Sequence, residues 1–216
     1  MAARNTTGSV RLAPDPAAVA MAAARVRAEL TSRGILLYHD ARLPSATALA
    51  AGEPLAGSWW GHPKGALVYA ALSGLGDDVA WPKLVSGKVT LVHRSLWPAL
   101  AAAALSGAPW QTRDLPRDAR SVLAQLDRPT RVDALRTEAL PARRVGALLT
   151  ELERRLLVHA ESVHTDSGHH ARLLTPWSAW CERVGLTRKS LPSPTDAYAT
   201  FERAIAGWQG ARLPWS

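Results

Sequence analysis

Cysteine is nearly absent from this sequence, since Cys181 is the only one among 216 residues. A single cysteine excludes an internal disulfide, a thiolate zinc cluster and an iron–sulfur site within one chain, and it is typical of a reducing compartment. No run of 18 apolar residues occurs, so the sequence predicts no membrane-spanning helix. The first residues, MAARNTTGSVRLAPDP, lack the apolar core of a signal peptide. We therefore expect a cytoplasmic protein.

Lysine is also scarce, with four residues against 22 arginines, and the net charge is nevertheless +8. A basic excess of this size is typical of proteins with an anionic partner, and nucleic acid is the first such partner to consider. The excess is spread as +4, +2 and +2 over residues 1–110, 111–180 and 181–216, with no basic tail. Any basic surface must therefore be assembled by folding.

The first half of the chain predicts an α+β unit over residues 16–110, behind a mobile arm at 1–15. An alanine-rich helix is expected to begin at Pro16 and to end before Gly34, since proline at a helix start and glycine after its end are typical boundary signals. The segments KLV and KVTLVH flank a Ser-Gly turn, a pattern typical of a β-hairpin. The other expected elements are a buried strand or helix end in GILLYH, a long connection at 40–57, and helices at 66–75 and 94–105.

The second half predicts a winged helix-turn-helix domain over residues 111–180, followed by a C-terminal helical extension at 181–216. Helices are expected at 116–126, at 130–140 and from Pro141 to His159, and the apolar residues of the third recur at helical spacing. ESVHTDSGHHARLLT then indicates a strand, a turn and a strand. A further helix is expected at 193–208. The predicted fold class is thus α+β and mostly helical.

In a helix-turn-helix protein the second helix of the motif enters the major groove, so its exposed face must offer donors to phosphates and bases. The face opposite the apolar stripe carries Arg143, Thr150 and Arg154, with Arg144 beside them. The expected wing adds His164, His169, His170 and Arg172. Glu151 and Glu153 weaken the field of this helix, so a solvated face or a protein contact is the alternative interpretation.

The segment GSWWGHPKG, residues 57–65, predicts a shaped loop, because its glycines permit unusual dihedrals and Pro63 extends the residue before it. Trp59 and Trp60 are candidates for stacking on a base, which is worth roughly 1–3 kcal/mol. His62 is the candidate acid or base and Lys64 the candidate phosphate ligand. A packed structural corner is the alternative.

The hairpin after this loop adds Lys83, Lys88 and His93 to the candidate DNA-binding residues. The loop itself contains no carboxylate, so Glu53, Asp77 or Asp78 must supply one if the loop is catalytic. The clustered histidines at 159–170 have no neighbouring cysteine, so wing contacts or a plain surface are favoured over a metal site. No metal or cofactor is predicted.

Three segments, SWWGHPKG, KLVSGKVTLVHRSLWP and ELERRLLVHAESVHTDSGHH, resemble a group of small bacterial proteins that share an SWWxHPxG pattern. The resemblance covers Gly57 to Trp180, and it implies no particular reaction. The half with the expected helices and wing is more distantly similar to the AlkZ-type winged-helix DNA glycosylases. Those proteins carry a Gln-x-Gln catalytic motif, which Gln111-Thr112-Arg113 does not match, so no catalytic residue is carried over.

These patterns favour a protein that binds duplex DNA, and they leave three hypotheses open. The first is a DNA-repair enzyme that accepts a flipped or damaged base on the tryptophan loop, as a glycosylase does. The second is a non-catalytic transcription regulator, and the third is a protein-interaction module. Salt-dependent binding to nucleic acid separates the first two from the third. The oligomeric state is left open.

Overall fold

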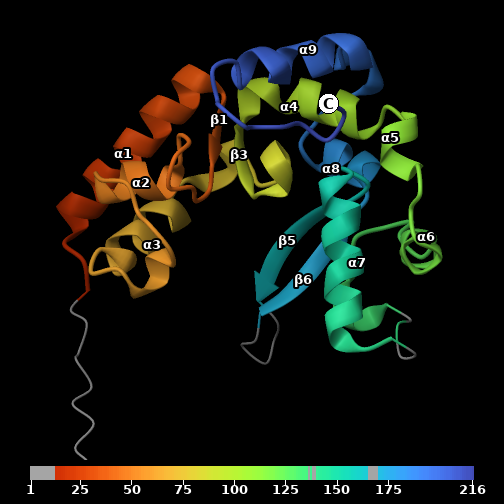
Figure 1. The fold of residues 1–216 in the computed structure, drawn as a ribbon, viewed down its shortest axis with the longest axis horizontal. Helices are drawn as coiled ribbons and strands as arrows, with labels where there is room; N and C mark the ends of the chain where they lie inside the picture. The colour runs from red at the N-terminus through yellow and green to blue at the C-terminus, as the bar shows by residue number, and fades with distance from the viewer. Residues whose placement is uncertain (1–12, 136, 138–139, 165–169) are drawn as a thin grey trace, which may run out of the picture.

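The computed structural model describes residues 13–135, 137, 140–164 and 170–216, about half of which are helical. These residues form nine α-helices and two three-stranded antiparallel sheets, which confirms an α+β fold (Figure 1). None of these helices has the length and apolar character needed to cross a membrane. The helices are α1 (Pro16–Arg33), α2 (Ala46–Ala51), α3 (Gly65–Ser73), α4 (Trp97–Ala104), α5 (Pro109–Thr112), α6 (Arg117–Leu123), α7 (Ala142–Arg154), α8 (Trp177–Arg183) and α9 (Pro194–Ala204).

The first sheet separates two apolar cores. Its order is β1-β3-β2, from the strands β1 (Ile35–Leu37), β2 (Val79–Ala80) and β3 (Thr90–His93). Leu36 pairs with Leu91, and both side chains pack against α1, α2 and α3. Their neighbours Ile35 and Val92 point to the opposite face, toward α4, α8 and α9. This alternation, which follows from the two-residue period of a strand, places helices on both faces of the sheet.

The C-terminal segment packs on the first half of the chain. Phe201 on α9 is fully buried beside the alanine-rich helix α4, and Trp180 on α8 joins the same core. Figure 1 shows α9 lying along α4 at the top of the molecule, with the C-terminus between them and α5. The small side chains of α4 allow this close packing of helices.

A third core lies in the lower right of Figure 1, where α6 and α7 pack with the second sheet. This sheet has the order β4-β6-β5, from the strands β4 (Thr130–Arg131), β5 (His159–His164) and β6 (His170–Thr175). Val145, Leu148, Leu149 and Leu152 of α7 point into the core, as their spacing predicts. The division of the chain into domains stays a prediction.

Helix α7 is shorter than the sequence indicates, because the backbone reverses at Leu156. That residue has φ 48°, and the N–H of Leu157 donates to the carbonyl of Leu152 at 2.9 Å. The N–H of Leu156 donates to the carbonyl of Glu153, which completes a Schellman-type ending. Leu156 then leaves the α7 core and is buried in the core beneath the first sheet.

Three local predictions are wrong. The expected helix at 130–140 is replaced, in the described residues, by β4 and a 3₁₀ turn at Val132–Ala134. The expected connection at 40–57 contains α2, whose alanines pack on α1 and α3. In the expected hairpin, KLV forms only a single bridge between Lys83 and Val89, and the pairing strand is β2. Pairing with other strands decides the first and third of these sites, whereas α2 follows the local helix propensity of its alanines between Ser45 and Gly52.

A buried carboxylate joins α7 to the first sheet. Glu153 is 8 % exposed, and its Oε2 accepts from Lys83 Nζ at 2.7 Å and from Arg172. Lys83 follows β2, whereas Arg172 lies on β6, so one side chain of α7 binds both sheets. Lys83 Nζ also lies 3.3 Å from the hydroxyl of Thr150. Burial makes each partner necessary to the others, because a buried charge without a partner is costly.

We expect Glu153→Ala to lower the free energy of unfolding by about 2–3 kcal/mol, because Lys83 and Arg172 are then left facing each other. Lys83→Ala is expected to cost less, because Arg172 still neutralises Glu153. Urea denaturation of both variants and of the double variant checks this order. Additive losses in the double variant would show that the pair is not coupled.

Candidate nucleic-acid interface and tryptophan loop

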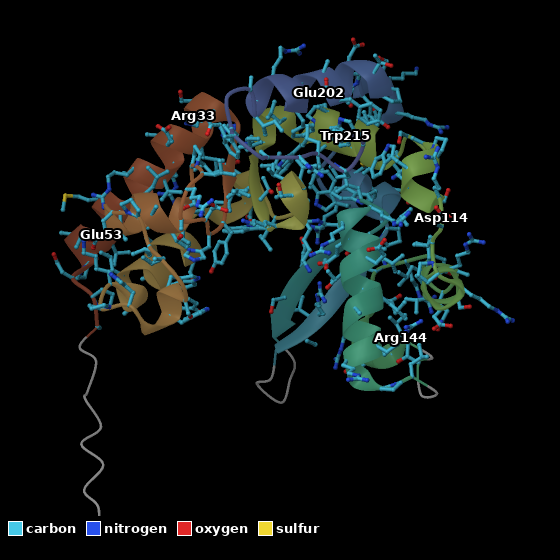
Figure 2. The ribbon with its side chains drawn as sticks, in the orientation of Figure 1. Arg33, Glu53, Asp114, Arg144, Glu202 and Trp215 are labelled. Carbon is cyan, nitrogen blue, oxygen red and sulfur yellow. The ribbon has the colours of Figure 1, made fainter. Side chains whose placement is uncertain are left out.

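Helix α7 has an open half and a covered half. Arg143, Arg144 and Ala147 in its first two turns are exposed on the side away from the core. Arg144 is exposed and lies 3.3 Å from the half-buried Asp118, so the pair contributes little stability. Figure 2 shows Arg144 at the lower end of the helix, away from the first sheet. These arginines are therefore accessible to a partner.

The last turns of α7 contact the first half of the chain instead. Thr150 is half-buried and bonded to Lys83. Arg154 packs over Gly87, where an added Cβ would lie 2.7 Å from Arg154 Nε. Thr150 therefore already has a partner within the chain, whereas Arg154 remains exposed at the edge of this contact.

The basic residues around the first sheet are largely engaged within the chain. Lys88 forms an ion pair with Asp40. Burial acts to raise the pKa of Asp40, but Lys88 and two backbone N–H groups lower that pKa to about 2. The His93 ring accepts a hydrogen bond from the N–H of Ser95 at 3.3 Å and so caps the following 3₁₀ turn. Their role in DNA binding stays a prediction.

The wing residues are described only in part. His164 and His170 pair in register at the end of the β5–β6 hairpin. His169 lies outside the described residues. Arg172 is held within the chain by Glu153, whose carboxylate it shares with Lys83.

The tryptophan loop places one ring inside and one outside. Trp59 is 4 % exposed and Trp60 is 57 % exposed. The two rings stack with centroids 4.0 Å apart and planes 25° apart. Tyr38 supports Trp59 edge-on at 5.9 Å, and Tyr69 lies beside Trp60 at 5.7 Å. The loop thus combines a packed corner with an exposed ring held on a buried one.

His39 and Gly65 fix the shape of this loop. His39 Nε2 lies 2.7 Å from the carbonyl oxygen of Gly57 and Nδ1 lies 2.8 Å from the Thr47 hydroxyl. Because a carbonyl only accepts, Nε2 carries a proton and donates to Gly57. Gly65 begins α3 directly against the loop, since an added Cβ would lie 3.0 Å from the Trp59 carbonyl oxygen.

The candidate catalytic residues of the loop meet a carboxylate. Lys64 Nζ lies 2.7 Å from Glu53 Oε1 and donates to the carbonyl of Ala51 at 2.7 Å. Lys64 lowers the pKa of Glu53 through this hydrogen bond and through its charge, and His62 adds to the effect. The His62 Nδ1 atom accepts from the N–H of Lys64 at 3.2 Å. Of the three carboxylates considered, Glu53 is therefore the one that reaches this group.

The loop and the open half of α7 are far apart. In Figure 2, Glu53 lies at the left of the molecule and Arg144 at the lower right. The structure therefore does not bring His62 and Lys64 together with Arg143 and Arg144 in one cleft.

Gln111, the residue nearest to a catalytic motif, is a structural residue. Its side chain is 2 % exposed, and Nε2 donates to the carbonyl of Ala104 at 2.8 Å. Its Oε1 accepts from the hydroxyl of Ser106 at 3.0 Å and from the N–H of Ala108 at 3.1 Å. The amide thus fixes the connection between α4 and α5.

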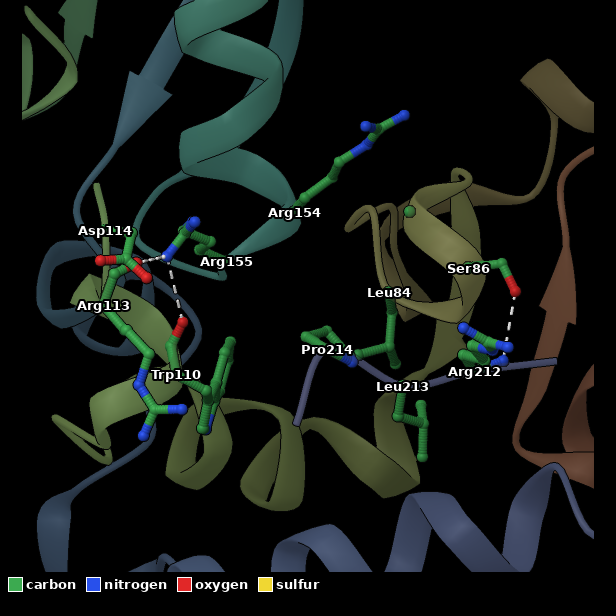
Figure 3. A pocket seen from close by; sticks show the side chains of 11 residues that line it. Leu84, Ser86, Trp110, Arg113, Asp114, Arg154, Arg155, Arg212, Leu213 and Pro214 are labelled. Carbon is green, nitrogen blue, oxygen red and sulfur yellow. Dashed lines mark hydrogen bonds between the residues drawn. The ribbon is translucent and has the colours of Figure 1, made fainter. Parts of the chain in front are cut away.

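A cavity of about 550 Å³ lies where the end of α7 meets three other segments (Figure 3). Its polar wall is dominated by arginines that the sequence patterns did not single out together. These four arginines come from three places in the chain, namely Arg113, the adjacent pair Arg154 and Arg155, and Arg212. No spacing signal connects these residues, since only folding brings them together.

A second hollow, of about 540 Å³, combines Trp81, Trp97 and Trp180 with Glu161 and Arg183. Glu161 accepts two hydrogen bonds from Arg183, at 2.6 and 2.7 Å, and lies 3.2 Å from His159 Nε2. Burial acts to raise the pKa of Glu161, but His159 and Arg183 lower that pKa to about 2. This carboxylate is already satisfied by the chain.

Among the residues that the structure describes, no three His, Cys, Asp or Glu side chains are grouped so as to hold a metal ion.

The chain was compared with protein-family models, curated proteins and solved structures, and no match was found in any of the three. Both resemblances noted from the sequence therefore stay predictions.

The two tryptophans are expected to differ in their contribution to stability. Trp59→Ala empties a buried site and is expected to lower the free energy of unfolding by about 3–5 kcal/mol. Trp60→Ala removes an exposed ring and one stacking contact, at a cost of about 1 kcal/mol. Thermal and urea denaturation measure both losses. Equal losses for the two variants would contradict this arrangement of the loop.

Proposed function

We propose that the protein binds duplex DNA through the open half of α7. The observation that carries this proposal is the exposed pair Arg143 and Arg144 at the start of a 13-residue helix. Among the described residues, Arg143 has no acidic partner, and Arg144 has only the half-buried Asp118. The free N–H groups and the dipole at a helix start also favour phosphate.

The surrounding topology supports a winged-helix interpretation. A helix, α6, and a short strand, β4, precede α7, and the β5–β6 hairpin follows it directly. The middle helix of the expected trio is replaced by the turn at Val132–Ala134. In this interpretation α7 enters the major groove with its N-terminal residues, and the hairpin is the wing.

The net charge of +8 favours an anionic partner over a neutral one. Nucleic acid is favoured over a protein partner because the exposed α7 face lacks a large apolar side chain. A transcription regulator and a structure-selective DNA-binding protein share this surface, and they differ in whether one operator sequence is preferred.

Removing the α7 arginines is expected to weaken DNA binding. Arg143→Ala and Arg144→Ala are each expected to reduce the binding free energy by about 1 kcal/mol, a loss of roughly threefold to tenfold in affinity. Each is also expected to lower the slope of log affinity against log salt concentration by about 1. Fluorescence anisotropy with a labelled duplex at several salt concentrations measures both quantities.

Arg203→Ala is the matched control, because Arg203 is an exposed arginine on α9, at the far end of the molecule from the start of α7. Wild-type affinity and salt slope in the Arg143→Ala, Arg144→Ala double variant would refute the proposal.

A second candidate function is base recognition at the tryptophan loop, favoured by the exposed Trp60 ring on its buried support. A flipped or unpaired base would stack on Trp60. Lys64 would hold a phosphate, and His62 or Glu53 would exchange a proton with the base, as in a glycosylase. This function needs a DNA path that leads from α7 to the loop.

Trp60→Ala is expected to lower affinity about tenfold for a duplex with one unpaired base, in line with the stacking energy of one base. Affinity for a fully paired duplex is expected to stay unchanged. Competition binding with the two duplexes measures the difference, and a base-release assay of wild type and Glu53→Gln tests catalysis. The same loss on both duplexes would exclude base stacking at Trp60.

A further inference from the structure

The arginine cavity at the end of α7 is assembled from segments that lie far apart in the chain. Its walls are residues 84–87, 110–114 and 154–155, and the C-terminal residues 212–214. Two backbone-linked hydrogen bonds hold the tail in place. The N–H of Ser86 donates to the carbonyl of Arg212 at 2.7 Å, and Ser86 Oγ accepts from the N–H of Arg212 at 3.2 Å.

The cavity has an excess of positive charge that the chain does not neutralise. Arg113, Arg154 and Arg212 have no carboxylate partner among the described residues. Arg155 is bound to Glu151 at 2.5 Å, and Asp114 is the acidic residue in the cavity wall. These three arginines are exposed, so their mutual repulsion is screened, but their summed potential attracts an anion to the cavity.

The backbone around the cavity is strained. In the described part of the chain, the non-glycine residues with positive φ are Ser86 at 52°, Asp114 at 54° and Leu156 at 48°. Ser86 and Asp114 line the cavity, and Leu156 directly follows Arg155. Each such conformation costs of order 1–3 kcal/mol and persists where the surroundings enforce it, and such residues cluster at ligand sites.

The arginines stand on both sides of the opening. Figure 3 shows Arg113 and Arg155 beside Trp110 and Asp114, and Arg212 beside Ser86, while Arg154 extends upward from the end of α7. Arg154 can lie this close to the chain because Gly87 has no side chain. The four arginines thus line one opening and make the potential around it positive.

We propose that this cavity binds a phosphate group, carried by a free nucleotide or by a nucleic-acid strand. The planar forks of several arginines match the oxygens of phosphate, and hydrogen bonds between charged groups are the strongest in proteins. The site goes beyond the α7 face that we propose for duplex DNA, and it does not depend on it. Arg154 on the last turn of α7 places the two surfaces on the same helix.

Calorimetric titration at low salt tests the site with three probes, which are inorganic pyrophosphate, deoxyadenosine 5′-monophosphate and deoxyadenosine. We expect the two phosphates to bind and deoxyadenosine not to bind. Arg154→Ala and Arg212→Ala are each expected to weaken phosphate binding about tenfold, the loss of one charge-assisted contact. Asp114→Asn is expected to strengthen it, because a like charge is removed. Arg203→Ala serves as the control and keeps wild-type affinity.

Duplexes with a 5′-phosphate or a 5′-hydroxyl end distinguish the source of the phosphate. If Arg154→Ala lowers the affinity for the phosphorylated duplex more than that for the hydroxyl duplex, the site binds strand ends. If it lowers both affinities equally, the site binds the internal backbone. Circular dichroism confirms that each variant is folded, and Arg113→Ala replaces any variant that is not. Absence of phosphate binding by the wild type, or unchanged binding by all three arginine variants, overturns the proposal whatever the result for Arg143 and Arg144.

Discussion

The ion pairs of Glu153 are the interaction on which the arrangement of this molecule depends. The carboxylate lies on α7, and its partners Lys83 and Arg172 come from the two different sheets. A buried carboxylate is stable only with such partners, so the position of α7 against the first sheet is coupled to the second sheet. The end of α7 is further held by Gln111 and by Arg155, which binds Glu151 and the carbonyl of Trp110.

This anchoring divides the basic residues of the chain into two groups. Lys83 and Arg172 share the carboxylate of Glu153, and Lys88 pairs with Asp40, so these three side chains are held in ion pairs within the fold. Others, such as Arg143 on the open half of α7 and Arg212 in the cavity, have no carboxylate partner in the described residues. Part of the positive charge is thus used in ion pairs within the fold. Other basic side chains are exposed along α7 and at its end. The proposed DNA surface and the proposed phosphate site both follow from this division.

The sequence predicts regular elements better than connections. The apolar stripe of α7 and the proline and glycine around α1 lead to the correct helices, because these signals are local. The helix expected at 130–140 is wrong because β4 forms only through pairing with β6. The connection expected at 40–57 is wrong although α2 has local helix signals, namely its alanines between Ser45 and Gly52.

The candidate sites show the same limit. The buried Trp59 and the exposed Trp60 combine the two alternatives of a packed corner and an open ring, and Glu53, which binds Lys64, was one of three carboxylates considered. That Lys83 binds Glu153 was not predictable, since 70 positions separate the two residues. The arginine cavity likewise has no sequence signal, because its four arginines span residues 113–212.

The central claim is that DNA contacts the first turns of α7. Hydrogen–deuterium exchange of the protein alone and with a duplex at low salt tests this claim most directly. We predict that the duplex slows exchange in residues 142–150 and leaves residues 57–65 unchanged. Slower exchange in residues 57–65 with no change in α7 would contradict the account and would place the DNA on the tryptophan loop.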